Sequence, residues 1–142
     1  MMKKTSLILA AVMLVGTLLC LASCRGKIDA EGIWSEAVYT EDITVGDGEK
    51  TVFVTVEVED KSVTFTIKTD ETILGDALLK HGLIEGEDGA YGLYIKKVNG
   101  ITADYDLNQS YWGFYKDGEY MMTGVDGTEF ADGDRYELVY SK

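Results

Sequence analysis

The chain has 142 residues, a formal net charge of −12 at pH 7 and no proline. Such an acidic surface disfavours partners that are themselves anionic, which excludes nucleic acid and a membrane held by charge alone. With one histidine and two cysteines, the chain also lacks the ligands that zinc and iron sites use. Sixteen glycines mark the turns instead of proline, and the length allows one domain after a leader.

The first 23 residues predict a leader that is removed. Lys3 and Lys4 precede an uncharged apolar run from Leu7 to Leu21, which is short for a membrane span. Leu-Ala-Ser-Cys at 21–24 resembles the bacterial lipobox, so we expect cleavage before Cys24, lipidation of Cys24 and anchoring at the extracellular face of the cell membrane. A plain signal peptide or an uncleaved anchor helix is the alternative. With Cys20 removed and Cys24 lipidated, neither a disulfide nor a free thiol remains.

Residues 24–50 are acidic and loop-like, and they predict a tether that lifts the domain from the lipid surface. Trp34 indicates that the tether has some structure, and we expect one early strand at 34–39. The domain itself is expected to span 51–142.

Strict alternation predicts a hairpin at the start of this domain. Residues 51–58 place four valines on one face, and after a short polar turn the same period returns with Val63, Phe65 and Ile67. The period then changes to that of a helix at about 72–81, with Leu74 and Leu78 on its apolar face. Gly82 follows as a C-cap residue, and the lone histidine, His81, is expected to stabilise the helix end.

The remainder predicts short strands separated by turns. Residues 85–92 read as a glycine-rich loop, residues 93–100 as a strand that ends in the Asn99–Gly100 turn, and residues 110–122 as a hairpin around Asp117–Gly118. Residues 134–140 predict a final strand. The fold class is therefore α+β: a β-grasp-like, mixed four- or five-stranded sheet with one helix packed across it.

One segment is similar to a calcium loop in its first half only. Asp104, Asp106 and Asn108 have the spacing of the first EF-hand ligands. However, Gln109 stands where the sharp turn needs glycine, and Tyr115 stands where a bidentate glutamate is needed. The Asp-Gly pairs elsewhere are explained by turn geometry. Because no nucleophile arrangement can be assembled either, we expect no metal, no cofactor and no enzymatic activity.

Five aromatic residues cluster within ten positions of the predicted hairpin. Alternation places Trp112 and Phe114 in the core and turns Tyr111 and Tyr115 outward, joined by Tyr120. Exposed tyrosines are typical of recognition surfaces, so these three are the candidate ligand-binding residues. The alternative is that they only shield the strands from water.

The segment from about Val63 to Tyr140 resembles the small domain of uncharacterised function in Gram-positive surface lipoproteins that is related to the C-terminal domain of transcobalamin and intrinsic factor. The matching residues are Leu74-Leu78-Leu79-Gly82-Leu83, Asn99-Gly100, Trp112-x-Phe114-Tyr115 with Gly118, Gly124-Val125 and Asp132-Gly133-Asp134.

The resemblance implies a β-grasp-like fold and one half of a corrinoid site. The large helical domain that forms the other half in the vitamin carriers is absent from this chain. We therefore expect a lipid-anchored cell-surface domain that binds a ligand, such as a corrinoid or another nutrient, together with a partner such as a transporter or surface protein. The alternative is a structural or protein-interaction module at the cell surface.

Overall fold

The computed structural model describes residues 27–142. The predicted leader, its cleavage site and the lipidation of Cys24 lie outside the described residues. Within residues 27–142, no helix is both long enough and apolar enough to cross a membrane.

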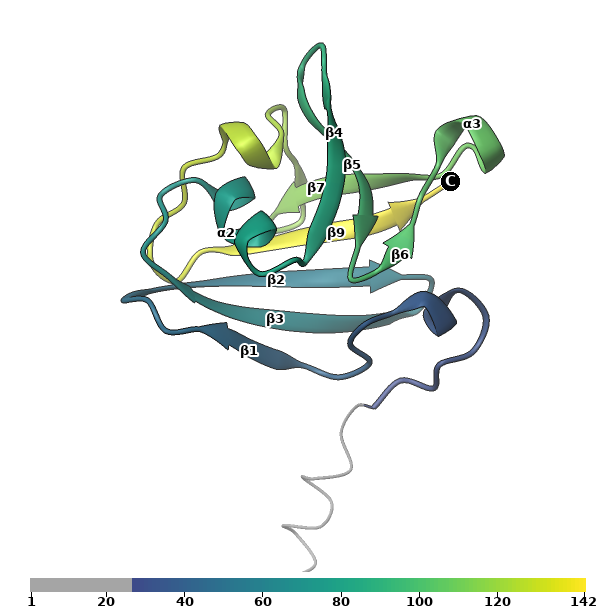
Figure 1. Cartoon of the computed structure of the whole chain (residues 1–142), viewed down its shortest axis with the longest axis horizontal. Coiled ribbons are helices and arrows are strands. Elements are labelled where there is room, and N and C mark those ends of the chain that lie inside the picture. Colours follow the sequence, from purple (N-terminus) through teal and green to yellow (C-terminus); the bar gives the residue numbers. More distant parts are fainter. Residues whose placement is uncertain (1–26) are drawn as a thin grey trace, which may run out of the picture.

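Six strands form the main sheet in the order β1-β3-β2-β9-β7-β8 (Figure 1). They are β1 (Ile43–Gly46), β2 (Lys50–Val58), β3 (Lys61–Thr69), β7 (Tyr111–Lys116), β8 (Glu119–Tyr120) and β9 (Arg135–Ser141). Neighbouring strands run antiparallel except in the pairs β1–β3 and β2–β9, which are parallel. The last strand of the chain thus lies in the middle of the sheet, between the first hairpin and the aromatic strand β7.

A second, three-stranded sheet projects from the main one in Figure 1. It consists of β4 (Ile84–Gly89), β5 (Gly92–Val98) and β6 (Ile101–Thr102), all antiparallel. The helical segments are η1 (Gly32–Glu36), α2 (Leu74–Lys80), α3 (Tyr105–Asn108) and η2 (Val125–Gly127).

The predicted class, α+β with a helix packed on a sheet, is what the structure shows, but the predicted size of the sheet is wrong. The main sheet has six strands because residues before 51 supply β1, whose Ile43 pairs with Phe65. The strand predicted at 93–98 joins a separate sheet with β4 and β6 instead of entering the main one.

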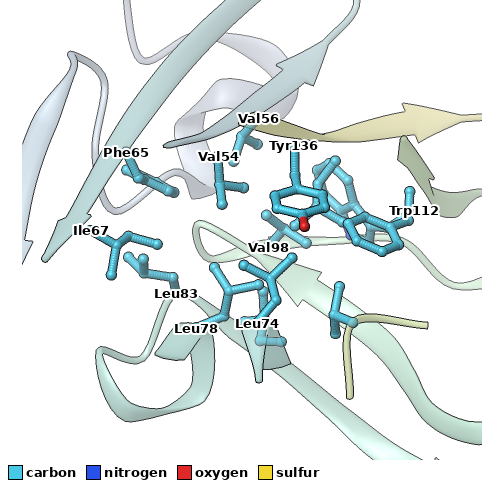
Figure 2. Packing of buried hydrophobic residues seen from close by; sticks show 14 of the residues in the cluster. Val54, Val56, Phe65, Ile67, Leu74, Leu78, Leu83, Val98, Trp112 and Tyr136 are labelled. Atoms are coloured by element: carbon cyan, nitrogen blue, oxygen red, sulfur yellow. The ribbon is translucent and has the colours of Figure 1, made fainter. Parts of the chain in front are cut away.

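The first hairpin and the helix form the core as predicted. Val52, Val54, Val56 and Val58 are fully buried, as are Phe65 and Ile67 from β3. Figure 2 shows Leu74 and Leu78 of α2 directed at this layer. Burial of such apolar side chains is the main source of stability in a domain without disulfides.

The helix is shorter than the predicted 72–81, for a reason that lies outside its own sequence. Ile73 is extended and forms an isolated bridge with Glu129, and the Leu74 N–H donates to the Thr128 carbonyl oxygen. Pairing with the distant segment therefore delays the first helical turn. At the other end, His81 is the C-cap residue and Gly82 is left-handed, as predicted.

Residues that the sequence assigned to a tether pack on the domain from Ile28 onward. Trp34 is 2% exposed and belongs to the core cluster, and its Nε1 donates to the Val58 carbonyl oxygen at 3.4 Å. The strand predicted at 34–39 is wrong, because Gly32–Glu36 form a 3-10 turn that places the indole against the sheet. The packed unit therefore begins well before residue 51.

The glycine-rich loop predicted at 85–92 is also wrong, since residues 84–89 form β4. Five of its six residues are exposed, so no apolar alternation announces the strand. Gly86 sits where the register with β5 shifts, and a Cβ there would collide with the Tyr94 carbonyl oxygen. Glycine is thus required by the close approach of two strands.

The predicted Asn99–Gly100 turn connects β5 to β6 and fastens the N-terminal segment. Both residues have positive φ, and the Asn99 side chain is buried. Its Oδ1 accepts from the Tyr39 N–H at 2.9 Å, and its Nδ2 donates to the Tyr39 carbonyl oxygen at 2.8 Å. The Asn99 carbonyl oxygen also accepts from the Val38 N–H. The side chain and the carbonyl oxygen of Asn99 therefore hold residues 38–39 as a strand partner would.

Replacing Asn99 by glycine should remove both side-chain bonds while keeping the left-handed turn. We expect a loss of about 1–3 kcal/mol in the free energy of unfolding, because the Tyr39 backbone groups lose their partners. Urea unfolding measures this loss. The control is Asp117→Asn in the exposed turn after β7, where we expect a change within about 0.5 kcal/mol. Equal effects of the two substitutions would contradict the proposed role of Asn99.

Candidate functional site

A groove of about 320 Å³ lies between β5, the β7–β8 hairpin and the segment that leads from β8 to η2. We call it the aromatic groove. Most of its lining residues are apolar or aromatic, and Thr123, the tyrosine hydroxyls and backbone groups add polar surface. Its members come from Tyr91–Ile95, from Tyr111, Trp112 and Phe114 of β7, and from Tyr120–Val125.

Two rings of β7 turn from the core toward this groove. Trp112 and Phe114 are each 8% exposed and lie on the core face, as predicted. Phe114 stacks on Tyr136 with the ring centroids 5.6 Å apart, and Trp112 meets Tyr140 edge to face at 5.6 Å. Figure 2 shows Trp112 beside Tyr136 at the margin of the core. The rings are therefore held rigidly by strand β9 behind them.

The indole N–H of Trp112 is buried and has no hydrogen-bond partner among the described residues. Leaving such a donor unpaired costs about 1–3 kcal/mol. Buried polar groups are nearly always satisfied, so each exception needs a physical reason. Trp112 also lines the aromatic groove, although its N–H itself lies beneath the surface.

The three candidate tyrosines have different surroundings. Tyr111 is 40% exposed, Tyr120 is 63% exposed, and both line the aromatic groove. Tyr115 does not. Its ring lies over Gly113, close enough that a Cβ there would be 2.9 Å from the ring, and it meets Tyr120 edge to face. Tyr115 thus covers the backbone of its own strand. This position fits the alternative in which the tyrosine only shields the strand from water.

Sequence reasoning missed the opposite wall of the groove. Tyr91 lies in the predicted loop and Tyr94 in the strand predicted at 93–100, while Met121 and Met122 come from the chain after β8. Tyr91 and Met122 are almost fully exposed. No local sequence pattern indicates this wall, because the contact between these segments and β7 depends on tertiary structure.

Asp126 fixes the two parts of this wall to each other. Its Oδ2 accepts from the Leu93 N–H at 3.0 Å, which joins η2 to the start of β5. Glycines allow the approach: a Cβ at Gly92 would lie 2.7 Å from Asp126 Oδ2, and one at Gly124 would lie 3.0 Å from Oδ1. At Gly75, on α2, a Cβ would lie 3.0 Å from the Asp126 backbone. Asp126 therefore ties together the segments that form this wall of the groove.

A second hollow of about 470 Å³ continues from the aromatic groove, because Tyr94 and Tyr111 line both. We call it the acidic hollow, since Asp104 and Asp106 line it together with Tyr105 and Lys96. The Lys96 Nζ lies 3.4 Å from Glu87 Oε1, so this base has a carboxylate partner outside the hollow. The two hollows are therefore adjacent, with the aspartates in the second one.

The calcium-like spacing at 104–108 belongs to a short helix. Asp104 caps α3, with its Oδ1 accepting from the Asp106 N–H at 3.0 Å, and Asn108 Oδ1 accepts from the Ser110 N–H. Gln109 is left-handed, as the residue after a helix often is. Among residues 27–142, no three His, Cys, Asp or Glu side chains are grouped so that they could hold a metal ion.

Behind the groove, Asp134 orders the ring on which Phe114 stacks. Its Oδ2 accepts from the Ala131 N–H at 2.9 Å and from the Tyr136 hydroxyl at 3.1 Å, and Lys116 Nζ lies 3.5 Å away. The Ala131 N–H lowers the pKa of Asp134, helped by Tyr136 and Lys116 and opposed by burial. Burial and the Asp134 charge raise the pKa of Tyr136 to about 12.

Comparisons with known proteins identify relatives of this fold. A model of the family described as "Domain of unknown function (DUF4430)" matches residues 70–142, just over half of the chain. A 1.30 Å crystal structure from Ruminococcus gnavus ATCC 29149, described as that of a candidate metal-binding protein, is 40% identical with a TM-score of 0.62. The match covers 66% of this chain and 98% of that one.

A more distant structural match is haptocorrin in complex with Cbi, at 19% identity and a TM-score of 0.47. It covers 69% of this chain but only 27% of haptocorrin. No curated protein sequence matches the chain.

Removing the Asp126 carboxylate should loosen the groove wall. We expect the Leu93 amide hydrogen of Asp126→Ala to exchange at least about tenfold faster than in the native chain, because its acceptor is lost. In Asp126→Asn, the side-chain oxygen can still accept, so exchange should stay close to the native rate. Amide exchange followed by NMR measures both. Equal protection in all three proteins would show that Asp126 does not hold β5.

The Asp134 carboxylate should make part of the stability depend on pH. Since its pKa is lower in the folded chain than its ordinary value of 3.8, its contribution is present above that value and is lost as the pH falls through the folded pKa. We expect the free energy of unfolding to fall less steeply below about pH 4 in Asp134→Asn than in the native protein. Urea unfolding at a series of pH values measures this slope. Identical slopes would contradict the assignment.

Proposed function

The chain belongs to the family described as "Domain of unknown function (DUF4430)", and we propose that it is a non-enzymatic ligand-binding domain. In this proposal, lipid on Cys24 holds it at the extracellular face of the cell membrane. The observation that carries the binding function is the aromatic groove, which rings from β5, β7 and β8 line together. Localisation rests on the leader sequence alone.

The groove has the composition of a small-molecule site. Such sites are concave, mostly apolar, and carry a few polar groups that orient the ligand. Here rings and methionines supply apolar surface, while Thr123, the tyrosine hydroxyls and backbone groups supply polar surface. The volume of about 320 Å³ lies at the lower end of the range for ligand pockets, roughly 300–1,000 Å³.

Catalysis has little support from this lining. Among the described residues that line the aromatic groove there is no carboxylate, histidine, cysteine or lysine, so no general acid–base pair faces it. His81 lies at the end of α2, where its side chain approaches Gly46 on the first edge strand. The metal binding named for the R. gnavus relative has no grouped ligand set among residues 27–142.

A corrinoid is the ligand that the sequence resemblance favours. The groove would hold only part of so large a molecule, so this version of the proposal needs a second surface, such as a transporter or another surface protein, to cover the rest. Protein interaction is the second candidate function. The exposed side chains around the groove, among them Tyr91, Tyr120 and Met122, favour it, because clustered exposed apolar residues mark interaction sites.

Isothermal titration of the full chain with cobinamide and with cyanocobalamin tests the corrinoid version. We expect binding heat from the native protein and at least about tenfold weaker binding by the Tyr111→Ser/Tyr120→Ser variant, since each ring supplies contact area at a small entropic cost. The control is Leu79→Ser, an exposed substitution on α2 outside the groove. Absence of heat at high-micromolar protein would remove the corrinoids as ligands. Equal binding by all three proteins would remove the groove as their site.

A further inference from the structure

The described strands leave outer edges at β1, β4, β6 and β8 and along the part of β7 that β8 does not cover, and these edges are protected differently. Edge strands present unpaired backbone groups, and proteins usually blunt them with charges, proline or short length. β4 carries exposed Glu85, Glu87 and Asp88, β1 has only four residues, and β6 and β8 have two each. The outer edge of β7 at 111–114 has the sequence Tyr-Trp-Gly-Phe, with neither a charge nor a proline. It is the edge that lacks these protections.

The backbone groups of Trp112 point toward this open edge. The Met121 N–H donates to the Phe114 carbonyl oxygen at 2.9 Å, so the polar groups of Phe114 face the β8 side. Residues two apart in a strand direct their backbone groups to the same side. Those of Trp112 therefore also face the β8 side, but β8 ends at Tyr120 and no described strand continues it there.

The aromatic groove lies along this edge. A strand added beside Trp112 would direct every second side chain to the face on which the Trp112 ring lies. That face is the groove. The occupant would thus bring apolar side chains to the rings and methionines that line the groove.

Charge favours a basic residue at one end of the occupant. The acidic hollow continues the groove past Tyr111, and its one base, Lys96, has Glu87 as a partner. Asp104 and Asp106 thus give that end an excess of negative charge, in a chain whose net charge is −12. Complementary charge steers a cationic segment to this end.

We propose that an extended peptide with alternating apolar residues and a basic end adds to the open edge of β7 and fills the aromatic groove. Recognition by strand addition draws affinity from backbone bonds and specificity from pockets for alternate side chains. The inference rests on the proposed function in one respect, which is that the groove is a binding site. It differs from that proposal in the ligand, which is a peptide instead of a corrinoid.

Selection from a random displayed-peptide library on the immobilised full chain supplies the probe. A selected peptide is then synthesised with single N-methyl groups at successive positions. Because only alternate N–H groups of an added strand bond to β7, we expect at least about tenfold weaker binding at every second position and near-native binding between them. Uniform or absent effects of N-methylation would overturn strand addition, as would the failure to select any peptide.

Substitutions in the protein test the same geometry. Trp112→Phe keeps a ring but removes part of the ring surface that lines the groove and should weaken the peptide several-fold. Asp104→Asn/Asp106→Asn should weaken peptides with a basic end more than those in which that residue is alanine. Leu79→Ser is the control and should bind as the native protein does. No loss in Trp112→Phe combined with no loss in the aspartate variant would overturn the placement of the peptide.

Two further outcomes separate this inference from the proposed function. Binding of cobinamide in the groove with no peptide selected would leave the proposed function standing and remove the peptide. Failure of both probes would remove both. If the measured mass doubles as the protein concentration rises and the dimer does not bind the peptide, the occupant of this edge is a second copy of the chain. That outcome would overturn the peptide proposal.

Discussion

The antiparallel pairing of β7 with the central strand β9 is the constraint on which both the core and the groove depend. Phe114 pairs with Leu138, and a shift of one residue would exchange the two faces of β7. In the observed register, Trp112 and Phe114 lie on the core face, while Tyr115 lies over Gly113 on the other. The rings that complete the core therefore also line the groove. Stability and recognition share the same side chains, so a substitution at either ring changes both.

Local patterns predicted the elements whose faces differ in polarity. The β2–β3 hairpin has one buried and one half-exposed face, which produces strict alternation, and the Asp117–Gly118 turn joins β7 to β8 with both residues at positive φ. β4 has no such contrast, because its residues after Ile84 are exposed on both faces. The strand predicted from Trp34 is wrong, because a single buried ring in a 3-10 turn produces no periodic pattern in the sequence.

The candidate site was predicted only in the part that β7 supplies. Alternation indicated which rings of β7 turn inward, and two of the three chosen tyrosines, Tyr111 and Tyr120, do line the groove. It could not show that Tyr115 folds back over Gly113, which depends on side-chain direction. Nor could it supply the opposite wall, because that wall depends on the bond between Asp126 and Leu93, 33 residues apart in the chain.

The groove exists because β8 ends early. After Tyr120, the chain makes one more bond to β7, through the Met121 N–H, and then leaves the edge for η2, where Asp126 reaches β5. The same departure exposes the backbone of Trp112 and builds the facing wall. Since β2 and β3 each run for nine residues, the chain is able to form long strands. An edge left open lowers stability, and a strand added there, as we propose, would offset part of that loss.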